Sequence, residues 1–572
     1  MNKGVFSRLL RELGAAKIPL VISFITSAAS VVVALYIPVL IGEFIDMIAD
    51  GKFDAAKASS FLICVGLLAA SSALFRWISD SLSNSVVFKT VASMRKAAYS
   101  KLSRLPVSYF DTHPKGETIN RIINDTDAVG SGLLLGLSQF FGGIVTIVFT
   151  LIFMLRIDLK ITALVVVLTP LSLVVSSVIA KKTYRLFTDQ SKKRAEETSF
   201  LTETLGNLKL IKSFVREDET ARKYDEVCEA TAKSSRRAIF SSSLVNPSTR
   251  VVCATIYAAV GLAGAFSVIG GGLSVGALTV FLNYAGQYSK PFNEISAVIA
   301  EIQGSAAAAA RVYELIDEED EEDGEATLKS VRGDVSFSHV SFSYDKEKTL
   351  LTDVTFDVKA GGKVAVVGPT GCGKTTLINL LMRFYDPDGG VITVDGVDTR
   401  TLSKDSLRSH FGMVLQDTFL FDATVMENLT VGAEVSAEEV EEVCRLTRAD
   451  NFIKKLPQGY ATPLTEGGGE LSEGERQLLS ITRVMLTRPE ILILDEATSS
   501  VDTRTEAEIN SALDRLMAGK TSFIVAHRIS TVKNADMILV MRDGDIVEIG
   551  RHDELMAAGG FYSELYRSQF EA

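Results

Sequence analysis

The chain has 572 residues, 47% of them hydrophobic, and a formal net charge of −11. This length exceeds what one hydrophobic core accommodates, so we expect at least two domains. Residues 1–316 hold 33 Lys and Arg against 24 Asp and Glu, a net +9, whereas the remainder carries −20. Because the basic half is also the apolar half, the pattern disfavours nucleic-acid binding, which needs basic clusters on a soluble domain.

The N-terminus is typical of a short amphipathic helix on a membrane surface, and it does not resemble a cleavable signal. Apolar residues there alternate with basic ones, namely Val5, Phe6, Leu9, Leu10 and Leu13 with Lys3, Arg8, Arg11 and Lys17. A long apolar run follows at once, which disfavours an ordinary soluble helix.

Five runs lack any charged residue: 18–42, 58–75, 128–155, 161–180 and 251–289. A helix over the last run would be roughly 58 Å long, about twice the hydrocarbon thickness of a bilayer, so it must turn back at Gly270–Gly272. We therefore predict six transmembrane helices in residues 1–316, at about 18–48, 58–83, 128–155, 159–182, 244–269 and 274–300.

The distribution of Lys and Arg predicts the orientation of these helices. Basic residues concentrate before the first run and in residues 89–121 and 181–237. We expect both termini and the two long loops to be cytoplasmic. The loop segments near 106–117 and 211–219 carry aromatic residues at their tips. They are interpreted either as solvated helical hairpins or as contacts for another domain.

The composition changes after residue 316. Residues 317–330 are acidic and predict a linker. From residue 331 onward, short β-rich runs (335–342, 364–367, 491–494 and 521–525) alternate with helical ones, which is typical of a parallel α/β domain over 331–572. The fold class is thus multidomain: an all-α, six-helix transmembrane domain followed by an α/β P-loop domain.

Residues Gly368–Thr375 match the phosphate-binding pattern G-x-x-x-x-G-K-[ST], after a strand at 363–367 and before a helix at 376–384. Such a loop surrounds a polyphosphate with backbone N–H groups. We expect Lys374 to reach the β/γ-phosphates and Thr375 to ligate Mg²⁺. The candidate nucleotide ligands of the loop are Gly368, Pro369, Thr370, Gly371, Cys372, Gly373, Lys374, Thr375 and Thr376.

A second motif places two carboxylates after a buried strand, Ile491–Leu494 followed by Asp495 and Glu496. Ligands of parallel sheets sit at the carboxyl ends of the strands. We therefore assign Asp495 to Mg²⁺ and Glu496 to the attacking water. The five cysteines lie far apart, which favours unpaired thiols over disulfides or a metal site.

With these motifs, nearly the whole chain resembles an ABC transporter half-unit of the exporter type. Residues Leu471–Glu475 resemble the family signature L-S-G-G-Q, with Glu473 and Glu475 as departures and with Ser472 and Gly474 kept. The resemblance implies four further roles. Tyr344 would stack on adenine, Gln416 would link Mg²⁺ and water to the membrane helices, His527 would contact the γ-phosphate, and Asp502 would cross the dimer interface.

The resemblance also implies a mechanism. Two domains would sandwich two ATP with Mg²⁺, each between one phosphate loop and the partner's signature, and drive alternating access. Phe110 and Asp111, and Phe214 and Glu217, would belong to the coupling helices. The chain has one loop and one signature, so it must dimerise; a heterodimer is favoured over a homodimer. A bacterial plasma (inner) membrane is the expected location.

The expected activity is ATP-driven export of a hydrophobic or amphipathic compound such as a drug, lipid or peptide. Uptake of a chelated nutrient such as a siderophore, and an ATP-gated channel or regulator, are the alternatives. Polar residues in membrane helices are costly and often face a cavity, which makes Arg250, Asn283, Tyr284 and Gln287 substrate candidates. Helix–helix hydrogen bonding is the competing explanation for the uncharged ones.

Overall fold

The structure, a computed structural model, describes residues 3–51, 55–345, 349–415, 418–465, 467–495, 503–525 and 532–570. The chain divides into two compact units. The helical unit comprises Met1–Arg104 and His113–Glu319, and the α/β unit comprises Leu105–Thr112 and Asp320–Ala572.

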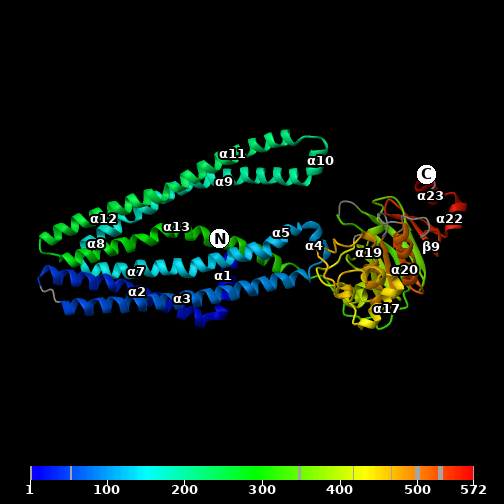
Figure 1. Cartoon of the computed structure of the whole chain (residues 1–572), viewed down its shortest axis with the longest axis horizontal. Helices are drawn as coiled ribbons and strands as arrows, with labels where there is room; N and C mark the ends of the chain where they lie inside the picture. The colour runs from blue at the N-terminus through cyan, green and yellow to red at the C-terminus, as the bar shows by residue number, and fades with distance from the viewer. Residues whose placement is uncertain are drawn as a thin grey trace. The chain divides into compact units, whose positions relative to one another are not determined.

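The helical unit consists of long helices joined by short turns (Figure 1). Its α-helices are α1 (Lys3–Leu13), α2 (Lys17–Ala49), α3 (Ala55–Leu102), α5 (Lys115–Asn120), α6 (Thr126–Leu135), α7 (Phe141–Ile157), α8 (Leu159–Leu168), α9 (Pro170–Gly206), α10 (Leu208–Ser213), α11 (Glu217–Ser243), α12 (Val245–Ile269) and α13 (Val275–Asp317). The 3₁₀ turn η1 (Gly14–Ala16) precedes α2, and the π-helical turns η2 (Arg121–Asp125) and η3 (Gly136–Phe140) continue the helix from α5 to α7. The predicted turn at Gly270–Gly272 is confirmed, since it separates α12 from α13.

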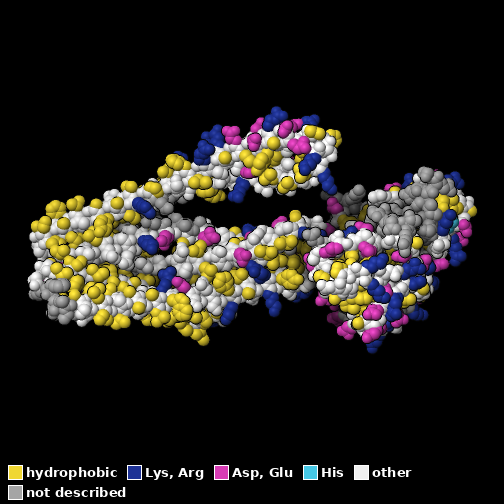
Figure 2. All heavy atoms as spheres, viewed as in Figure 1, with side chains coloured by type: hydrophobic (Ala, Val, Ile, Leu, Met, Phe, Trp, Pro, Cys, Tyr) yellow, Lys and Arg dark blue, Asp and Glu magenta, His cyan; other side chains and the backbone are white. Residues whose placement is uncertain are grey.

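Among the described residues, four helical stretches are long and apolar enough to cross a membrane: Lys17–Ala49, Ala58–Leu102, Lys115–Ile157 and Glu217–Ile269. Helix Leu159–Leu168 is apolar but shorter. Six crossings therefore stay a prediction. Figure 2 shows apolar side chains concentrated over one end of the helical unit and charged ones around α10 and α11.

Helix α13 organises the helical unit by polar contacts as well as packing. The hydroxyl of the fully buried Tyr284 donates to the carbonyl of Leu35 on α2 at 2.6 Å. Farther along α13, the Arg311 guanidinium pairs with both carboxylate oxygens of buried Asp125 in η2 at 2.8 and 2.6 Å. A π-helical turn is uncommon, and here it places Asp125 opposite Arg311.

Helix α1 is tied to the C-terminal end of α13. The Arg8 side chain pairs with the Asp317 carboxylate and lies 4.0 Å above the Tyr313 ring. Leu9 and Leu13 are buried, 3% and 4% exposed. The predicted amphipathic helix is present, and two of its apolar residues pack within the helical unit.

The described residues of the α/β unit form two sheets, with strand orders β2-β1-β4-β5 and β10-β9-β3-β8-β7-β6. Its strands are β1 (Val335–Phe342), β2 (Leu351–Val358), β3 (Lys363–Val367), β4 (Gly389–Val394), β5 (Val397–Asp398), β6 (Phe411–Val414), β7 (Ile491–Asp495), β8 (Thr521–Val525), β9 (Met537–Arg542) and β10 (Asp545–Gly550). In the larger sheet β9, β3, β8, β7 and β6 are parallel. The four predicted strands are confirmed as β1, β3, β7 and β8.

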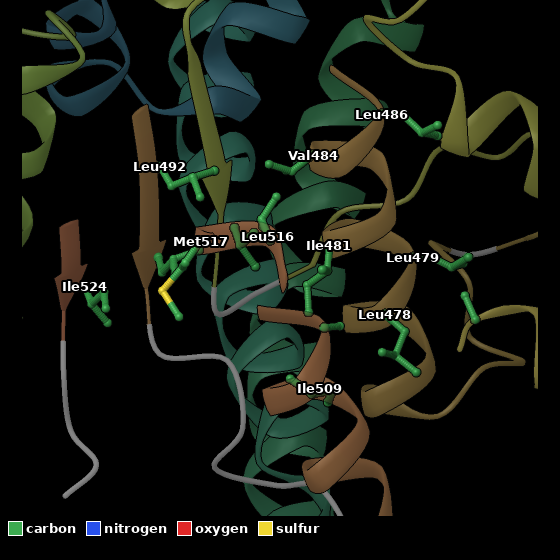
Figure 3. Packing of buried hydrophobic residues seen from close by; sticks show 14 of the residues in the cluster. Leu478, Leu479, Ile481, Val484, Leu486, Leu492, Ile509, Leu516, Met517 and Ile524 are labelled. Atoms are coloured by element: carbon green, nitrogen blue, oxygen red, sulfur yellow. The ribbon is translucent and has the colours of Figure 1, made fainter. Parts of the chain in front are cut away.

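Short helices surround these sheets. They are α4 (Val107–Thr112), α14 (Lys374–Leu381), α15 (Lys404–Arg408), α16 (Val425–Leu429), α17 (Ala437–Thr447), α18 (Asp450–Ile453), α19 (Glu473–Thr487), α20 (Thr503–Met517), α22 (His552–Ala558) and α23 (Phe561–Phe570). The predicted helix at 376–384 is displaced, because α14 begins directly after Gly373 and ends at Leu381. Figure 3 shows buried residues of α19 and α20 packed with Leu492 of β7 and Ile524 of β8.

The acidic segment after α13 lies against the α/β unit. The Glu321 carboxylate accepts from Lys404, a largely buried lysine, at 2.8 Å and from Arg408 at 3.3 Å. A Cβ on Gly324 would lie 2.3 Å from the carbonyl oxygen of Thr401, so the backbones approach closely there. These contacts hold in place part of the segment that its acidic composition predicted to be a linker.

Candidate nucleotide-binding site

The glycine-rich loop joins the central strand β3 to helix α14. A Cβ on Gly368 would lie 2.3 Å from the Met541 carbonyl of β9, so only glycine allows the chain to leave β3 at this point. Gly373 has φ +104° and precedes α14. None of the described side chains caps α14. Its first N–H groups therefore point toward the loop without a side-chain acceptor, which is the arrangement that binds an anion.

The Lys374 ammonium group lies across this loop. It is 8% exposed, and Nζ donates to the carbonyls of Gly368 at 2.9 Å and Pro369 at 3.0 Å. Burial raises the pKa of the neighbouring Cys372 thiol, so this thiol stays neutral and does not compensate the lysine charge. The Lys374 Nζ also lies 4.0 Å from the Cys372 sulfur. A buried cation with carbonyl oxygens and a neutral thiol as these partners favours an incoming anion.

The hydroxyl residues of the loop differ in exposure. Thr370 and Thr375 are exposed, whereas Thr376 is buried in the first turn of α14. Exposure leaves the Thr375 hydroxyl accessible to a ligand at the helix N-terminus. Thr376 is instead part of the packing beneath the loop.

The strand register places Asp495 beside the loop. Asp495 of β7 and Val366 of β3 both pair with Val525 of the intervening strand β8. The Asp495 carboxylate is thus at the same carboxyl edge of the sheet, about two strand spacings from β3, or roughly 10 Å. The two sequence motifs therefore lie at one edge of the sheet.

Tyr344 lies next to α14. Its ring is 51% exposed, and its hydroxyl accepts from Nδ2 of Asn379 at 3.3 Å. The ring also stands edge-to-face against Phe342 and Tyr385, with centroids 4.9 and 5.1 Å away. An exposed ring supported from behind suits stacking on a planar base. Sequence reasoning did not select Tyr385 or Asn379, because neither belongs to a recognised motif.

The signature residues form the start of α19. Ser472 caps the helix, and the Glu475 carboxylate accepts from the Ser472 backbone N–H at 2.9 Å and from its hydroxyl at 2.8 Å. The other acidic departure, Glu473, pairs with Arg476 at 2.8 Å. Both carboxylates are therefore bonded to other residues of the first turn of α19, and Gly474 between them in the sequence is buried.

Four predicted site residues lie outside the described residues: Gln416, Glu496, Asp502 and His527. For three of them, the preceding strand is described. Gln416 and His527 each follow a strand by two residues, β6 and β8, and Glu496 follows β7 directly. All three strands belong to the parallel sheet that carries the phosphate loop.

The two predicted loop tips contain short helices. Phe110 and Asp111 belong to α4, and the Asp111 carboxylate accepts a hydrogen bond from the Tyr385 hydroxyl within the α/β unit. Phe214 follows α10 and is 68% exposed, and Glu217 begins α11. The aromatic side chain of the second tip is thus on the surface.

The four polar candidates of the helical unit have different surroundings. Arg250 and Asn283 are exposed, and Gln287 donates to the Asn283 side chain at 2.7 Å. Tyr284 is bonded to α2, as helix–helix hydrogen bonding requires. A cleft of about 410 Å³ lies instead between α12 and α13, lined among others by Cys253, Ile256, Tyr257, Ala285, Gly286 and Ser289. Small residues on facing helices were the only sequence signal for it.

Comparisons with known proteins agree with this geometry. The ABC transporter transmembrane region family matches residues 20–292, and the ABC transporter family matches residues 351–499. A fatty acid ABC transporter ATP-binding/permease protein of Mycobacterium bovis is 38% identical over 517 residues, which cover 90% of this chain and 82% of that protein. An ATP-dependent lipid A-core flippase of Desulfotalea psychrophila is 33% identical, over 99% of this chain and 100% of the relative.

A third relative, an uncharacterized ABC transporter ATP-binding protein of Bacillus subtilis, is 35% identical over 100% of this chain and 95% of its own length. The matches extend through the apolar helices and the α/β unit, so the protein is a multi-pass membrane protein with a nucleotide-binding domain. The chain therefore belongs to the ABC transporter family, as an exporter-type half-transporter whose ATPase domain drives export across a membrane.

Proposed function

We propose that the chain forms one half of a dimer that exports hydrophobic or amphipathic compounds, with its nucleotide-binding domain and both termini in the cytoplasm of a bacterium. The observation that carries the nucleotide site is the Lys374 ammonium, which is buried over a glycine loop, donates to the carbonyls of Gly368 and Pro369, and makes a 4.0 Å contact with the neutral Cys372 thiol. Lys374 and the N–H groups at the start of α14 would hold the phosphates, and Tyr344 would stack on the base.

The residues around the loop fit a magnesium ion. Mg²⁺ prefers oxygen ligands and binds through few carboxylates together with substrate phosphates. The exposed Thr375 hydroxyl and the Asp495 carboxylate supply such oxygens at one sheet edge, and Gln416 would add an amide oxygen. When bound, the ion neutralises developing phosphate charge. Glu496 would orient and deprotonate the attacking water, and His527 would contact the γ-phosphate.

A second subunit completes each site in this proposal. Ser472 and Gly474 start α19 and would meet the γ-phosphate held by the other subunit, while Asp502 would lie across the interface. We favour a heterodimer, because the acidic signature with Glu473 and Glu475 resembles that of the catalytic partner in heterodimeric exporters. A homodimer would instead contain two identical sites.

The substrate class follows from chemistry shared by the relatives and from the helical unit. The names of the relatives include a fatty acid transporter, a lipid A-core flippase and a probable multidrug resistance transporter of Bacillus subtilis. Fatty acids and lipid A contain long apolar parts. The cleft between α12 and α13, with Ile256, Tyr257 and Gly286 in its lining, suits an apolar chain.

The test is the Mg²⁺-dependent ATPase activity of the chain purified alone in lipid nanodiscs. Wild type should bind ATP, and Lys374→Ala should lose nucleotide binding. ATP hydrolysis by the chain alone, stopped when EDTA removes Mg²⁺, would indicate a self-sufficient homodimer in place of the favoured heterodimer. A folded wild-type chain that binds no ATP would refute the proposed site. Binding without hydrolysis would point to a missing partner subunit, and co-purification would then identify it.

A further inference from the structure

The segment that follows α14 is held in place by a buried arginine. Arg383 is 3% exposed and has φ +51°, which ends the helix. Its Nε donates to Asp386 at 2.9 Å and its Nη1 donates to the Leu402 carbonyl at 2.7 Å. These bonds fix the backbone on both sides of Tyr385, so the position of this aromatic ring is determined by the core of the α/β unit.

Tyr385 contacts both Tyr344, the residue assigned to adenine, and Asp111, which is predicted to belong to a coupling helix. Its half-buried ring stands edge-to-face against Tyr344, with centroids 5.1 Å apart and an interplanar angle of 86°. Its hydroxyl donates to the Asp111 carboxylate of α4. Burial, and then the bond to Asp111, raise the pKa of the Tyr385 phenol, so the hydroxyl remains a donor at neutral pH.

The contacts form a continuous line across the α/β unit. Asn379, near the C-terminal end of α14, donates to the Tyr344 hydroxyl, and the Tyr344 ring meets Tyr385. Tyr385 then reaches α4, although Asp111 lies 274 residues earlier in the chain. The phosphate loop is at the opposite end of α14 from Asn379. Phosphates bound at that loop therefore do not contact Tyr344 or Tyr385 directly.

We propose that Tyr385 is a positioning residue that transmits occupancy of the adenine site at Tyr344 to α4 through its hydrogen bond to Asp111. The inference rests on the proposed function, in which Tyr344 stacks on the base. A base on the free face of Tyr344 restricts that ring. The restricted ring holds Tyr385 in place, and the Tyr385 hydroxyl then holds Asp111. The base, not the phosphates, is the part of ATP that acts on α4.

The experiment measures amide hydrogen exchange in the full chain, as the dimer in which it purifies, in lipid nanodiscs. Two probes separate base from phosphate: AMP-PNP, a non-hydrolysable ATP analogue, and inorganic tripolyphosphate. In wild type, AMP-PNP should slow exchange in both 368–376 and 105–112. Tripolyphosphate should slow exchange in 368–376 alone.

Two variants remove the proposed link, and a third is the matched control. Tyr385→Phe keeps the ring against Tyr344 and removes the hydroxyl, whereas Asp111→Ala removes the acceptor. Tyr460→Phe deletes a similar bond, from the Tyr460 hydroxyl to Asp450 at 3.3 Å, elsewhere in the unit. Loss of one such bond corresponds to about a two- to tenfold change in an equilibrium constant.

In Tyr385→Phe and in Asp111→Ala, AMP-PNP should still protect 368–376, while its effect on 105–112 should fall about two- to tenfold. The double variant should be no worse than either single one, and Tyr460→Phe should behave as wild type. Two results would overturn this inference but leave the proposed function standing. One is unchanged protection of 105–112 by AMP-PNP in Tyr385→Phe, and the other is protection of 105–112 by tripolyphosphate equal to that by AMP-PNP. Absence of any nucleotide protection at 368–376 would instead overturn the proposed function.

Discussion

Polar side chains behave differently in the two units. In the helical unit, buried hydroxyl groups form bonds between helices: Ser23 bonds Ser83 at 2.7 Å between α2 and α3, and Tyr284 bonds the Leu35 carbonyl. At the carboxyl edge of the large sheet, Thr375 is exposed and Lys374 is bonded to the loop backbone. An unpaired polar group is costly in lipid, whereas a binding site needs groups that can exchange partners. Substitutions in the first set should therefore change stability, and those in the second should change turnover.

The largest effect should come from Glu496→Gln. The amide cannot take a proton from the attacking water, so ATP hydrolysis should fall about 100-fold or more. ATP binding should persist, because the phosphate loop is untouched, and the dimer should accumulate in its closed form. Steady-state ATPase and retention of radiolabelled ATP measure the two properties. Wild-type hydrolysis in this variant would show that the base is another residue.

Arg311→Ala should produce the next largest change, and it should affect stability. The substitution leaves the Asp125 carboxylate, whose side chain is 6% exposed, without its bidentate partner. Such a loss costs about 3–5 kcal/mol for a fully buried pair; because the Arg311 side chain is 47% exposed, we expect about 1–3 kcal/mol. Thermal unfolding in nanodiscs should show a lower Tm. The control is Lys193→Ala, which breaks an exposed pair with Glu196 and should leave Tm unchanged.

Glu475→Gln should change the nucleotide site by a smaller factor. Glutamine at this position also completes a capping box with Ser472, so α19 should keep its stability. Removal of a negative charge near the triphosphate should lower the KM for ATP about threefold. Glu439→Gln is the matched control, since Glu439 forms the same capping box with Ser436 at α17. A KM that rises in Glu475→Gln would show that the carboxylate assists binding.

Tyr284→Phe separates packing from substrate contact in the helical unit. The loss of one helix–helix hydrogen bond should cost about 0.6 kcal/mol, and transport should be unchanged. Transport of a fluorescent fatty acid into inside-out vesicles provides the measurement. Arg250→Ala applies the same test to an exposed substrate candidate of the helical unit. If its transport and its substrate-stimulated ATPase both match wild type, Arg250 is not a substrate contact.

The smallest effect should be the pH dependence at the α16 capping box. Hydrogen bonds from the Thr424 backbone and hydroxyl lower the pKa of Glu427 below its usual 4.5. Stability from this carboxylate should be complete above about pH 4.5 and be lost as the pH falls through its lower folded-state pKa. The Tm difference between wild type and Glu427→Gln should therefore shrink from pH 7 to pH 4. An unchanged difference would contradict this.

The sequence by itself determined the family, the two-part organisation and the nucleotide-binding loop. Apolar runs too long for soluble helices identified a membrane region, because lipid requires continuous apolar helices. The spacing from Gly368 to Thr375 predicted a phosphate loop, because backbone geometry at glycine and the following helix N-terminus are local properties. These signals need no knowledge of distant contacts.

Only the tertiary structure decided which distant residues meet. Tyr385 reaches Asp111, Arg311 reaches Asp125, and Glu321 reaches Lys404 across separations of 274, 186 and 83 residues. Local sequence carries no signal for such pairs, because each depends on how whole helices and sheets pack. The acidic segment after α13 was therefore predicted as a linker without its contacts to Lys404 and Arg408, and Tyr385 was not distinguished from other aromatic residues.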